Sequence, residues 1–379
     1  MKTRKIAPRS SEIIKTMKRI VCFHLYNDYS GSPKVLRMVL EGLLRKGYRV
    51  DLVTSRGGVL DELQDTDDCH LHYYAYRFSA NPVTILRYTQ VQLFTFFWAL
   101  RWLFARNTTF YINTLLPVGP AFAGRLMGKR VVYHYHENAF IKGTFYKALA
   151  ATMEQLAHEI ICVSEYQASF LHRKEKVTVV PNALPKAFVE KLNPDAEAAF
   201  ERKTVLMLGS LKSYKGTKEF IELSQRMPRY KFVLVINDTK ENIDRYLSNN
   251  HLDDITGEGN LRIYPRQNDV LAFYNRASVV LNLSDRHRVI ETFGMTALEA
   301  MRAGLPVIVP TEGGIAEMVE NGENGYKIDV QQMDDIARHI EAMLTDEKDY
   351  RRMVDNALQQ AKRYDEQSMI DKIEILLEQ

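Results

Sequence analysis

Cysteine is scarce in this sequence. Only three cysteines occur among 379 residues, Cys22, Cys69 and Cys162, and their wide spacing fits neither a zinc site nor a disulfide framework. A small disulfide-stabilised protein is therefore excluded, and a reducing compartment such as the cytoplasm fits this usage best.

Long uninterrupted hydrophobic runs are missing as well. The most apolar long stretch, residues 85–105, contains two arginines and two glutamines, so it does not fit a clean membrane span. The basic start of the chain is not followed by a small-residue cleavage site, which argues against a signal peptide. We therefore expect a cytoplasmic protein.

The chain also lacks a strong excess of one charge. Lys and Arg total 51 against 47 Asp and Glu, a net charge of +4, and residues 1–19 alone hold seven basic residues against Glu12. The rest of the chain is close to neutral, so no nucleic-acid partner is expected. The basic N-terminal extension over residues 1–18 fits contact with anionic lipid or plain solvation.

What the sequence does contain is an alternation of short apolar runs with segments of helical period. With 379 residues, 46% hydrophobic and 26% charged, it is long enough for two ordinary domains. The alternation predicts an α/β protein with two Rossmann-like, doubly wound domains. The expected strands are 20–25, 49–54, 70–75, 109–113, 130–135, 159–163 and 177–180 in the first half, and 204–209, 231–236, 261–264, 278–283 and 306–309 in the second.

The boundaries of these domains follow from composition. The polar, proline-containing stretch 191–203 is the expected linker between an N-terminal domain over 19–190 and a C-terminal domain over 204–365. Apolar residues at helical spacing predict a last helix over 366–379, which we expect to pack back on the first domain. Ligands of such sheets bind beyond the carboxyl ends of the strands, so the site is expected in the cleft between two facing domains.

The most informative strand-to-helix loop is residues 291–314, ETFGMTALEAMRAGLPVIVPTEGG. Gly294 permits close backbone approach just before a helix, and free amides at a helix start bind anions such as a diphosphate. Glu299 lies further into that helix, where a carboxylate can accept hydrogen bonds from two ribose hydroxyls. Glu291 can hold sugar hydroxyls or offset positive charge in an oxocarbenium-like transition state.

This segment resembles the E-x7-E region of glycosyltransferase family 4, whose members have the GT-B fold and use activated sugar donors. Further motifs extend the resemblance over essentially the whole chain. VLMLGSLKSYKGTKEFIEL at 205–223 resembles the family's G-R-x4-K-G loop, and VTVVPNAL at 177–184 resembles its V-x-P-N-G-V strand end. The first strand, loop, helix and strand, over 20–55, are also similar to those of the family.

The resemblance implies roles for individual residues. Glu291 would contact the donor sugar and Glu299 the nucleotide ribose, while Lys215 would stabilise charge on the departing diphosphate. Sugar and diphosphate would also meet the amides around Phe293, Gly294, Met295 and Thr296.

One position departs from the family pattern. The family usually has arginine directly after the first glycine of the K-G loop, where this chain has Ser210. Lys212, or the basic run Arg286, His287 and Arg288, would then have to supply the second positive charge on the diphosphate. A solvated loop explains the basic run equally well.

The first domain offers two histidines and a helix start on its side of the cleft. The resemblance places the family's active-site histidine at the end of the strand 130–135, where His136 is the better match and His134 the alternative. Strand alternation puts both imidazoles on one face, so parity does not choose between them. Gly31 and Ser32 form a tight loop before a helix, which fits contact with an acceptor or ordinary capping.

No metal or resident cofactor is expected. The acidic stretch 65–68, DTDD, contains a D-x-D pair, but it lies outside the matching motifs and is interpreted as solvated surface. The nucleotide-diphosphate sugar would act as co-substrate.

The segment 84–105 carries aromatic residues beside arginines. This composition suits a helix at a membrane surface, although packing against the sheet explains many of the same residues. Together with the basic extension, it makes an anionic membrane surface a candidate partner, with the protein peripheral at the inner face.

The sequence therefore predicts a glycosyltransferase of the GT-B type. It would transfer a sugar from a nucleotide-diphosphate sugar to a glycan or lipid-linked acceptor hydroxyl in cell-surface polysaccharide or glycolipid biosynthesis, and the resemblance implies retention at the anomeric carbon. A sugar-nucleotide epimerase or hydrolase of the same fold and a non-catalytic sugar-nucleotide-binding protein are the alternatives. A nicotinamide-dependent dehydrogenase would need a G-x-G-x-x-G loop after the first strand, which is missing.

Overall fold

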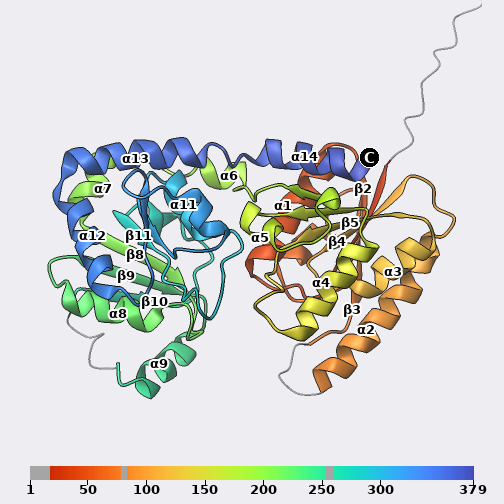
Figure 1. Ribbon diagram of the computed structural model, residues 1–379, viewed down its shortest axis with the longest axis horizontal. Coiled ribbons are helices and arrows are strands. Elements are labelled where there is room, and N and C mark those ends of the chain that lie inside the picture. The colour runs from red at the N-terminus through yellow and green to blue at the C-terminus, as the bar shows by residue number, and fades with distance from the viewer. Residues whose placement is uncertain (1–17, 78–82, 253–258) are drawn as a thin grey trace, which may run out of the picture.

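The computed structural model describes residues 18–77, 83–252 and 259–379, which form two α/β domains joined near one edge (Figure 1). The basic extension predicted over 1–18 lies almost wholly outside the described residues. All described strand pairs are parallel, as expected for strands joined by crossover helices.

The N-terminal sheet has seven strands in the order β3-β2-β1-β4-β5-β6-β7. Its strands are β1 (Arg19–His24), β2 (Arg49–Ser55), β3 (Cys69–Tyr74), β4 (Thr108–Asn113), β5 (Arg130–Tyr135), β6 (Glu159–Cys162) and β7 (Val177–Val179). Its helices are α1 (Gly31–Arg45), α2 (Val83–Ala99), α3 (Val118–Leu126), α4 (Thr144–Leu156) and α5 (Glu165–Ser169), with 3-10 turns η1 (Val59–Leu63), η2 (Leu100–Trp102) and η3 (Lys174–Lys176). The short helix α6 (Lys186–Val189) follows and packs on the C-terminal core through Phe188 and Val189.

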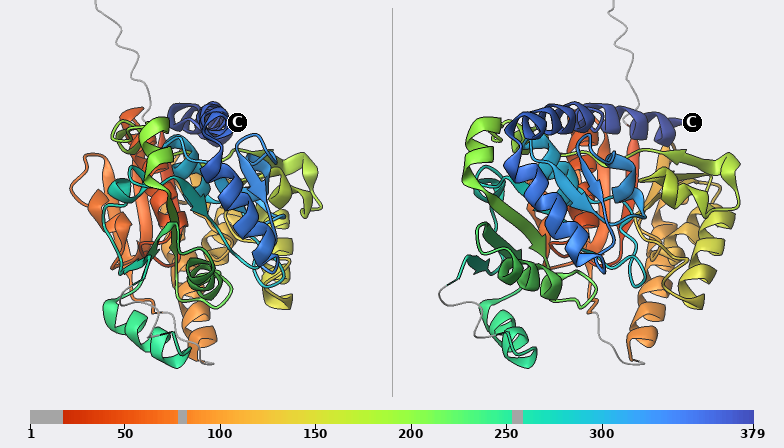
Figure 2. Two further views of the ribbon diagram at one scale, coloured as in Figure 1. Left: turned by 90° about the vertical axis from the view of Figure 1, so that its left-hand side faces the viewer. Right: turned by 60° about the vertical axis from the view of Figure 1, so that its left-hand side comes forward.

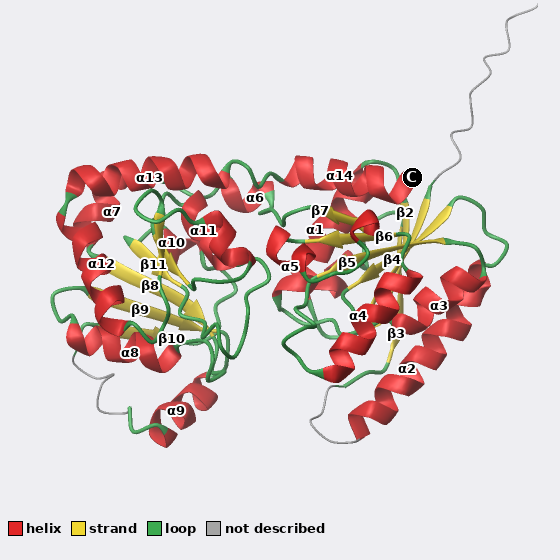
Figure 3. Cartoon of the chain, viewed as in Figure 1, coloured by secondary structure: helices red, strands yellow, loops and turns green. Residues whose placement is uncertain are grey.

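The C-terminal sheet has six strands in the order β10-β9-β8-β11-β12-β13 (Figure 3). Its strands are β8 (Thr204–Gly209), β9 (Lys231–Ile236), β10 (Leu261–Tyr264), β11 (Val279–Leu281), β12 (Val307–Val309) and β13 (Gly325–Lys327). Helices of this half are α7 (Ala196–Arg202), α8 (Thr217–Arg226), α9 (Lys240–Asn249), α10 (Leu271–Tyr274), α11 (Met295–Arg302), α12 (Met333–Thr345) and α13 (Glu347–Ala361), with the 3-10 turn η5 (Gly314–Met318).

The predicted fold class is confirmed, because both sheets are parallel and doubly wound. Each expected strand occurs within two residues of its predicted bounds, and only β13 was not expected. In β13 only Gly325 is fully buried, so this three-residue strand gives no apolar run for a sequence pattern to detect.

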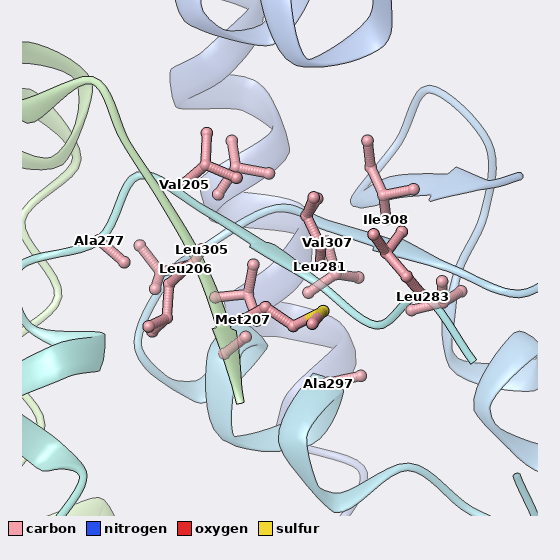
Figure 4. Close-up of a cluster of buried hydrophobic side chains, with 14 of the residues drawn as sticks. Val205, Leu206, Met207, Ala277, Leu281, Leu283, Ala297, Leu305, Val307 and Ile308 are labelled. Atoms are coloured by element: carbon pink, nitrogen blue, oxygen red, sulfur yellow. The ribbon is translucent and has the colours of Figure 1, made fainter. Parts of the chain in front are cut away.

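Strand alternation builds a core on each face of the N-terminal sheet. Ile20 and Cys22 of β1 face the cluster beneath α1, whereas Val21 and Phe23 face the cluster beneath α3 and α4. The C-terminal sheet is likewise covered on both faces, and Figure 4 shows Val205, Met207, Leu281, Val307 and Ala297 among its packed side chains.

The chain ends on the first domain. Helix α13 lies along the C-terminal domain and α14 (Glu366–Glu378) runs on over the N-terminal one (Figures 1 and 2). Met369, Ile373 and Leu377 of α14 join the apolar cluster beneath α1. Gly42 of α1 permits this contact, because a side chain there would overlap Ile370.

Two predicted segments differ in detail from the structure. Residues 191–203 are not purely a connection, because α7 lies within them and buries Ala199 and Phe200 in the C-terminal core. The segment 84–105 forms α2 and η2, and Trp102 packs on Phe23 with ring centroids 6.4 Å apart. Packing therefore explains Trp102, but several apolar side chains of the segment remain exposed. None of the described helices is long and apolar enough to cross a membrane.

Candidate functional site

The candidate site lies where loops after β5, β8 and β11 meet between the domains. Thr292 Oγ1, on the loop after β11, donates a hydrogen bond of 2.8 Å to the backbone carbonyl of His136, on the loop after β5. Nearby, the Glu317 carboxylate accepts hydrogen bonds from the backbone amides of Glu165 and Tyr166 at the start of α5. These contacts bring the Glu291 loop and the His136 loop together.

Lys215 and Glu291 form an ion pair on the C-terminal side of the site. The Lys215 ammonium contacts Glu291 Oε1, which also accepts a 2.7 Å hydrogen bond from Ser284 Oγ. Burial alone would raise the pKa of Glu291, but the charge of Lys215 and the hydrogen bonds to its carboxylate outweigh burial and lower it. Glu291 is therefore an anion at neutral pH, with Lys215 beside it.

Glycines fix the backbone around Glu291. Gly294 has φ +97°, and a side chain there would overlap Ile315. A side chain at Gly313, which has φ +105°, would overlap the Glu291 carbonyl, and one at Gly314 would overlap the Thr292 carbonyl. The 291–294 loop and the 313–314 turn thus pack directly on each other. This packing holds Glu291 close to the N-terminus of α11.

Glu299 lies one turn into α11, beside a buried tyrosine. Tyr274 Oη donates a 2.5 Å hydrogen bond to Glu299 Oε2. Burial raises the pKa of Glu299, while this hydrogen bond and the charge of Lys34 on α1 partly oppose the rise. No hydrogen bond within the described part of the chain occupies Glu299 Oε1, which leaves it available to a ligand hydroxyl.

The start of α11 touches both domains. Phe293 is buried and packs on Tyr364, with ring centroids 5.6 Å apart. Met295 packs partly against the cores of both domains, and Thr296 is partly exposed next to it. The backbone amides at this helix start therefore lie at the boundary between the two halves of the molecule.

The basic residues near Ser210 divide into paired and exposed groups. Arg286 contacts the carboxylates of Glu312 and Asp329, so its charge is already compensated. Arg288 instead donates to Ser213 on the K-G loop, at 2.6 Å from Nη2 to Oγ. His287 lies 3.4 Å from Asp329, and Lys212 is exposed. Of the basic run, Arg288 alone is held directly on the loop that contains Ser210 and Lys215.

On the N-terminal side, hydrogen bonds join His24, Asn113 and His136. The register of β1 with β4 and of β4 with β5 places His24, Asn113 and His134 at one level across three strands. His24 Nε2 lies 2.8 Å from the Tyr26 carbonyl and His24 Nδ1 lies 3.0 Å from Asn113 Nδ2. Asn113 Oδ1 in turn lies 3.0 Å from His136 Nε2.

This chain of bonds fixes the tautomers. The Tyr26 carbonyl can only accept, so His24 Nε2 carries a proton, and burial lowers the pKa of His24 to about 4. Neutral His24 then accepts at Nδ1 from the Asn113 amide, which turns Asn113 Oδ1 toward His136 and requires a proton on His136 Nε2. Burial, then the neighbouring His134 and His24, lower the pKa of His136 well below 6.5. His136 Nδ1 is therefore an unprotonated acceptor.

The structure separates the two histidines that alternation left equivalent. His134 is fully buried within β5, with Nδ1 2.6 Å from Tyr111 Oη, and burial lowers its pKa to about 3. His136 follows the strand and is partly exposed, and its ring lies tilted against that of His134 with the centroids 4.1 Å apart. His134 thus packs against His136 but is itself enclosed within the sheet.

Gly31 and Ser32 were expected in a tight loop before a helix, but they are the first two residues of α1, and the preceding loop ends at Ser30. A side chain at Gly31 would meet nothing within 4 Å, and Ser32 is partly exposed. Lys34, one turn further along α1, acts electrostatically on Glu299. Asn27 anchors this loop through a 2.9 Å hydrogen bond to Asp61. The start of α1 thus acts on the C-terminal domain through the charge of Lys34.

No cluster of three or more His, Cys, Asp or Glu side chains is placed to hold a metal ion within residues 18–77, 83–252 and 259–379. Sequence reasoning missed several polar side chains that complete the site. His24, Lys34 and Thr292 lie in segments that resemble the family but were given no role, whereas Asn113, Tyr274 and Ser284 lie outside those segments.

Family models match nearly the whole chain. The model described as Glycosyltransferase Family 4 matches residues 29–187, and the model described as Glycosyl transferases group 1 matches residues 188–360. The chain belongs to glycosyltransferase family 4, which confirms the resemblance found in its motifs.

Individual relatives and one solved structure agree with this assignment. A glycosyltransferase of uncharacterised specificity from Haemophilus influenzae is 23% identical over 63% of this chain and 65% of its own length. The Campylobacter jejuni N,N'-diacetylbacillosaminyl-diphospho-undecaprenol alpha-1,3-N-acetylgalactosaminyltransferase is 24% identical over 56% of this chain and 58% of its own. The matched stretch thus spans about three fifths of these curated relatives. The structure of Anabaena HepE with UDP and glucose matches 95% of this chain and 99% of its own with a TM-score of 0.74 at 18% identity, which shows a shared GT-B fold.

Proposed function

We propose that this protein transfers a sugar from a nucleotide-diphosphate sugar to an acceptor hydroxyl, with retention at the anomeric carbon. The observation that carries the proposal is that a charged wall and a neutral wall meet at the boundary between the two domains. Lys215, Glu291 and Glu299 supply the first, and the unprotonated His136 Nδ1 supplies the second.

The charged wall suits a sugar diphosphate. The C–O bond between the anomeric carbon and the diphosphate breaks as the bond to the acceptor oxygen forms, and charge grows on the departing diphosphate. Lys215 neutralises that charge, and Arg288 is placed on the same loop. Glu291, kept ionised by Lys215, holds sugar hydroxyls and offsets positive charge at the anomeric carbon. The free Oε1 of Glu299 accepts from the ribose.

The neutral wall suits the acceptor. Because its pKa is so low, His136 is a weak base and serves to hold and orient a hydroxyl at Nδ1. We propose that no side chain acts as a nucleophile and that the acceptor proton passes to a diphosphate oxygen. Closure of the two domains would exclude water, which otherwise competes as acceptor. We propose that no metal ion takes part.

Names of relatives support the classes of donor and acceptor. HepE was solved with UDP and glucose, which supports a UDP-sugar donor. The Campylobacter relative is named for a diphospho-undecaprenol acceptor, which supports a lipid-linked glycan acceptor in cell-surface polysaccharide or glycolipid synthesis. A peripheral position at the inner face of an anionic membrane fits such an acceptor, and the exposed apolar side chains of α2 support it. Flotation with anionic and neutral vesicles tests this position, and absence from both would exclude it.

A donor screen tests the proposed activity. Thermal shifts with UDP-, GDP-, ADP- and dTDP-sugars are compared for the wild type, Lys215→Ala and Glu299→Ala, with product analysis in each case. Stabilisation by one nucleotide that both variants lose is expected. An epimerised or hydrolysed sugar formed as fast without acceptor as with it would favour the epimerase or hydrolase, and binding without any turnover would favour a binding protein.

A further inference from the structure

A cavity of about 190 Å3 lies at the carboxyl end of the N-terminal sheet, apart from the residues of the donor site. It is formed by segments that follow β1, β3 and β4 and by the starts of α2 and α4. Five aromatic rings line it: Tyr26, Tyr76, Tyr88, Phe145 and Tyr146. The rings contact one another edge to face, with centroids 6.2 Å apart for Tyr26 and Tyr76 and 5.8 Å apart for Tyr88 and Phe145.

The residues that line this cavity favour an apolar ligand over a polar one. Its aliphatic members include Leu25, Ile85 and Leu116, and none of the described lining residues is charged. Tyr88 Oη already donates a 2.8 Å hydrogen bond to the Leu116 carbonyl. A sugar ring placed here would lose hydrogen bonds to water with few replacements, which disfavours it, whereas a hydrocarbon group would gain by burial.

The size of the cavity limits its occupant. Sites that enclose a whole small ligand have volumes of roughly 300–1,000 Å3. At about 190 Å3 the cavity has room for one apolar group of a larger molecule. The rest of that molecule must lie outside it.

An apolar path leads away from the mouth of the cavity. Ile85 lines the cavity yet is 68% exposed, so the cavity opens beside it. Leu86, Leu93 and Phe97 of α2 are each more than half exposed, and their spacing of seven and four residues places them on one face of the helix. At 1.5 Å per residue this stripe extends about 16 Å along α2, which lies at the outer edge of the N-terminal domain (Figure 1).

The cavity is also joined to the acceptor side of the candidate site. Tyr26 lines it, and the Tyr26 carbonyl accepts from His24, the first member of the chain that continues through Asn113 to His136. Leu116 lies three residues beyond Asn113 on the same loop. A molecule with its hydroxyl at His136 would therefore have the cavity wall close by.

We propose that this aromatic cavity binds a hydrocarbon group of the acceptor, and that a longer hydrocarbon chain continues over the exposed stripe of α2. The inference rests on the proposed transfer to an acceptor hydroxyl. It names what the acceptor must carry next to that hydroxyl, an aliphatic chain, and where this protein holds it.

Alkyl glucosides test the proposal on the full-length protein. Methyl, butyl, hexyl and octyl β-D-glucoside are titrated below their micelle concentrations, with calorimetry as the readout. We expect affinity to rise up to about fourfold for each added methylene, the value for full burial of a CH2 group, and then to level off as the cavity fills. Equal affinity for methyl and octyl glucoside would overturn the proposal in favour of a sugar-binding cavity.

Matched substitutions locate the binding. Ile85→Asp and Phe145→Asp place a charge at the exposed mouth and should weaken octyl glucoside binding at least tenfold. Phe104→Asp is the control, because Phe104 is 91% exposed and does not line the cavity, and it should bind as the wild type does. If Phe104→Asp weakens binding as much as Ile85→Asp, the chain binds the general apolar surface and the proposal is wrong.

UDP-induced thermal shifts on the same samples separate this proposal from the proposed function. Ile85→Asp should keep the full UDP shift, because the donor site lies on the other domain. If the wild type binds alkyl chains in the cavity but no nucleotide, the transferase proposal fails while the hydrocarbon site stands. If UDP binds and affinity does not depend on chain length, the cavity proposal alone fails.

Discussion

The two sides of the candidate site use opposite electrostatics. On the C-terminal side Lys215 and Glu291 are both charged and paired, and their mutual attraction lowers the pKa of the carboxylate despite burial. On the N-terminal side burial lowers the pKa of His24, His134 and His136. The charge of Asp28 opposes this effect at His24 without cancelling it, so all three histidines are neutral. Charge therefore lies on the wall proposed for the diphosphate, and neutral hydrogen bonds lie on the wall proposed for the acceptor.

One architecture thus supplies two kinds of recognition. Both walls are loops at the carboxyl ends of parallel strands. The donor wall must match a dianionic group whose charge grows during the reaction, so a cation placed there is worth much. The acceptor wall must orient a neutral hydroxyl, for which fixed tautomers suffice. Substitutions on the donor wall should therefore act mainly through charge, and those on the acceptor wall through orientation.

The largest effect is expected from Lys215→Ala. We expect kcat/KM for the donor to fall by about 10²–10³, because the cation proposed to neutralise the departing diphosphate is lost. Without Lys215 burial also raises the pKa of Glu291, so the acid limb of the pH profile should move to higher pH. Rates from pH 4.5 to 8 check both effects. Lys218→Ala, an exposed lysine on α8, is the control and should change kcat/KM less than twofold. An equal fall in kcat/KM in both variants would contradict a specific role of Lys215.

Asn113→Ala should have the next largest effect. It leaves His24 Nδ1 and His136 Nε2 without partners and should cost about 1–3 kcal/mol of stability. Because His136 loses its fixed orientation, kcat should fall about tenfold or more while donor KM changes little. Asn260→Ala is a matched control, since the Asn260 amide also donates to backbone carbonyls, those of Ser224, Met227 and Tyr230, and none of these belongs to a site loop. Similar loss of stability with unchanged kcat is expected there; a drop in kcat in both variants would point to general destabilisation.

The sequence was sufficient to predict the architecture, because buried parallel strands are apolar runs that stand out from their surroundings. The sequence did not predict the elements that bury only one or two side chains. In β13 only Gly325 is fully buried, and α7 rests on Ala199 and Phe200 alone. These elements form because they pack against the rest of the domain, and such packing leaves no pattern in the local sequence.

The sequence predicted the C-terminal side of the candidate site better than its N-terminal side. Glu291, Lys215 and Glu299 lie in continuous motifs, so their loops could be found from the sequence. Asn113 and His24 lie 89 residues apart and meet only through the register of β1 with β4. The end of β5 at Tyr135 was predicted correctly, but only the structure shows that His134 is enclosed within the sheet while His136, just beyond the strand, is partly exposed.

A smaller effect is expected from Tyr274→Phe on the donor wall. Burial already raises the pKa of Glu299, and loss of the tyrosine hydrogen bond should raise it further. We expect UDP binding to weaken about fivefold at pH 7.5, and more at pH 5.5, where a larger fraction of Glu299 is protonated. Calorimetry at the two pH values measures this. Tyr350→Phe removes another buried tyrosine hydrogen bond, to the Ser278 carbonyl, and should leave UDP affinity unchanged at both. Parallel losses in the two variants would rule out a specific effect through Glu299.

The smallest effect on stability is expected from Gly31→Ala on the acceptor wall. A methyl group there meets nothing within 4 Å, so the free energy of unfolding should stay constant or rise by about 0.4–1 kcal/mol. Gly294→Ala provides the contrast, because its φ of +97° and the overlap with Ile315 should cost at least about 1–3 kcal/mol. Chemical denaturation measures both.

Activity assays of the Gly31→Ala variant test whether the acceptor lies next to Gly31. If the acceptor passes over this helix start, the added methyl group should slow transfer to the acceptor but leave hydrolysis of the donor by water unchanged, because water needs no space there. Equal slowing of transfer and hydrolysis would place Gly31 against the donor instead. Lys34, one turn further along α1, acts electrostatically on Glu299. Equal slowing would therefore mean that the start of α1 belongs to the donor site as well as to the acceptor site.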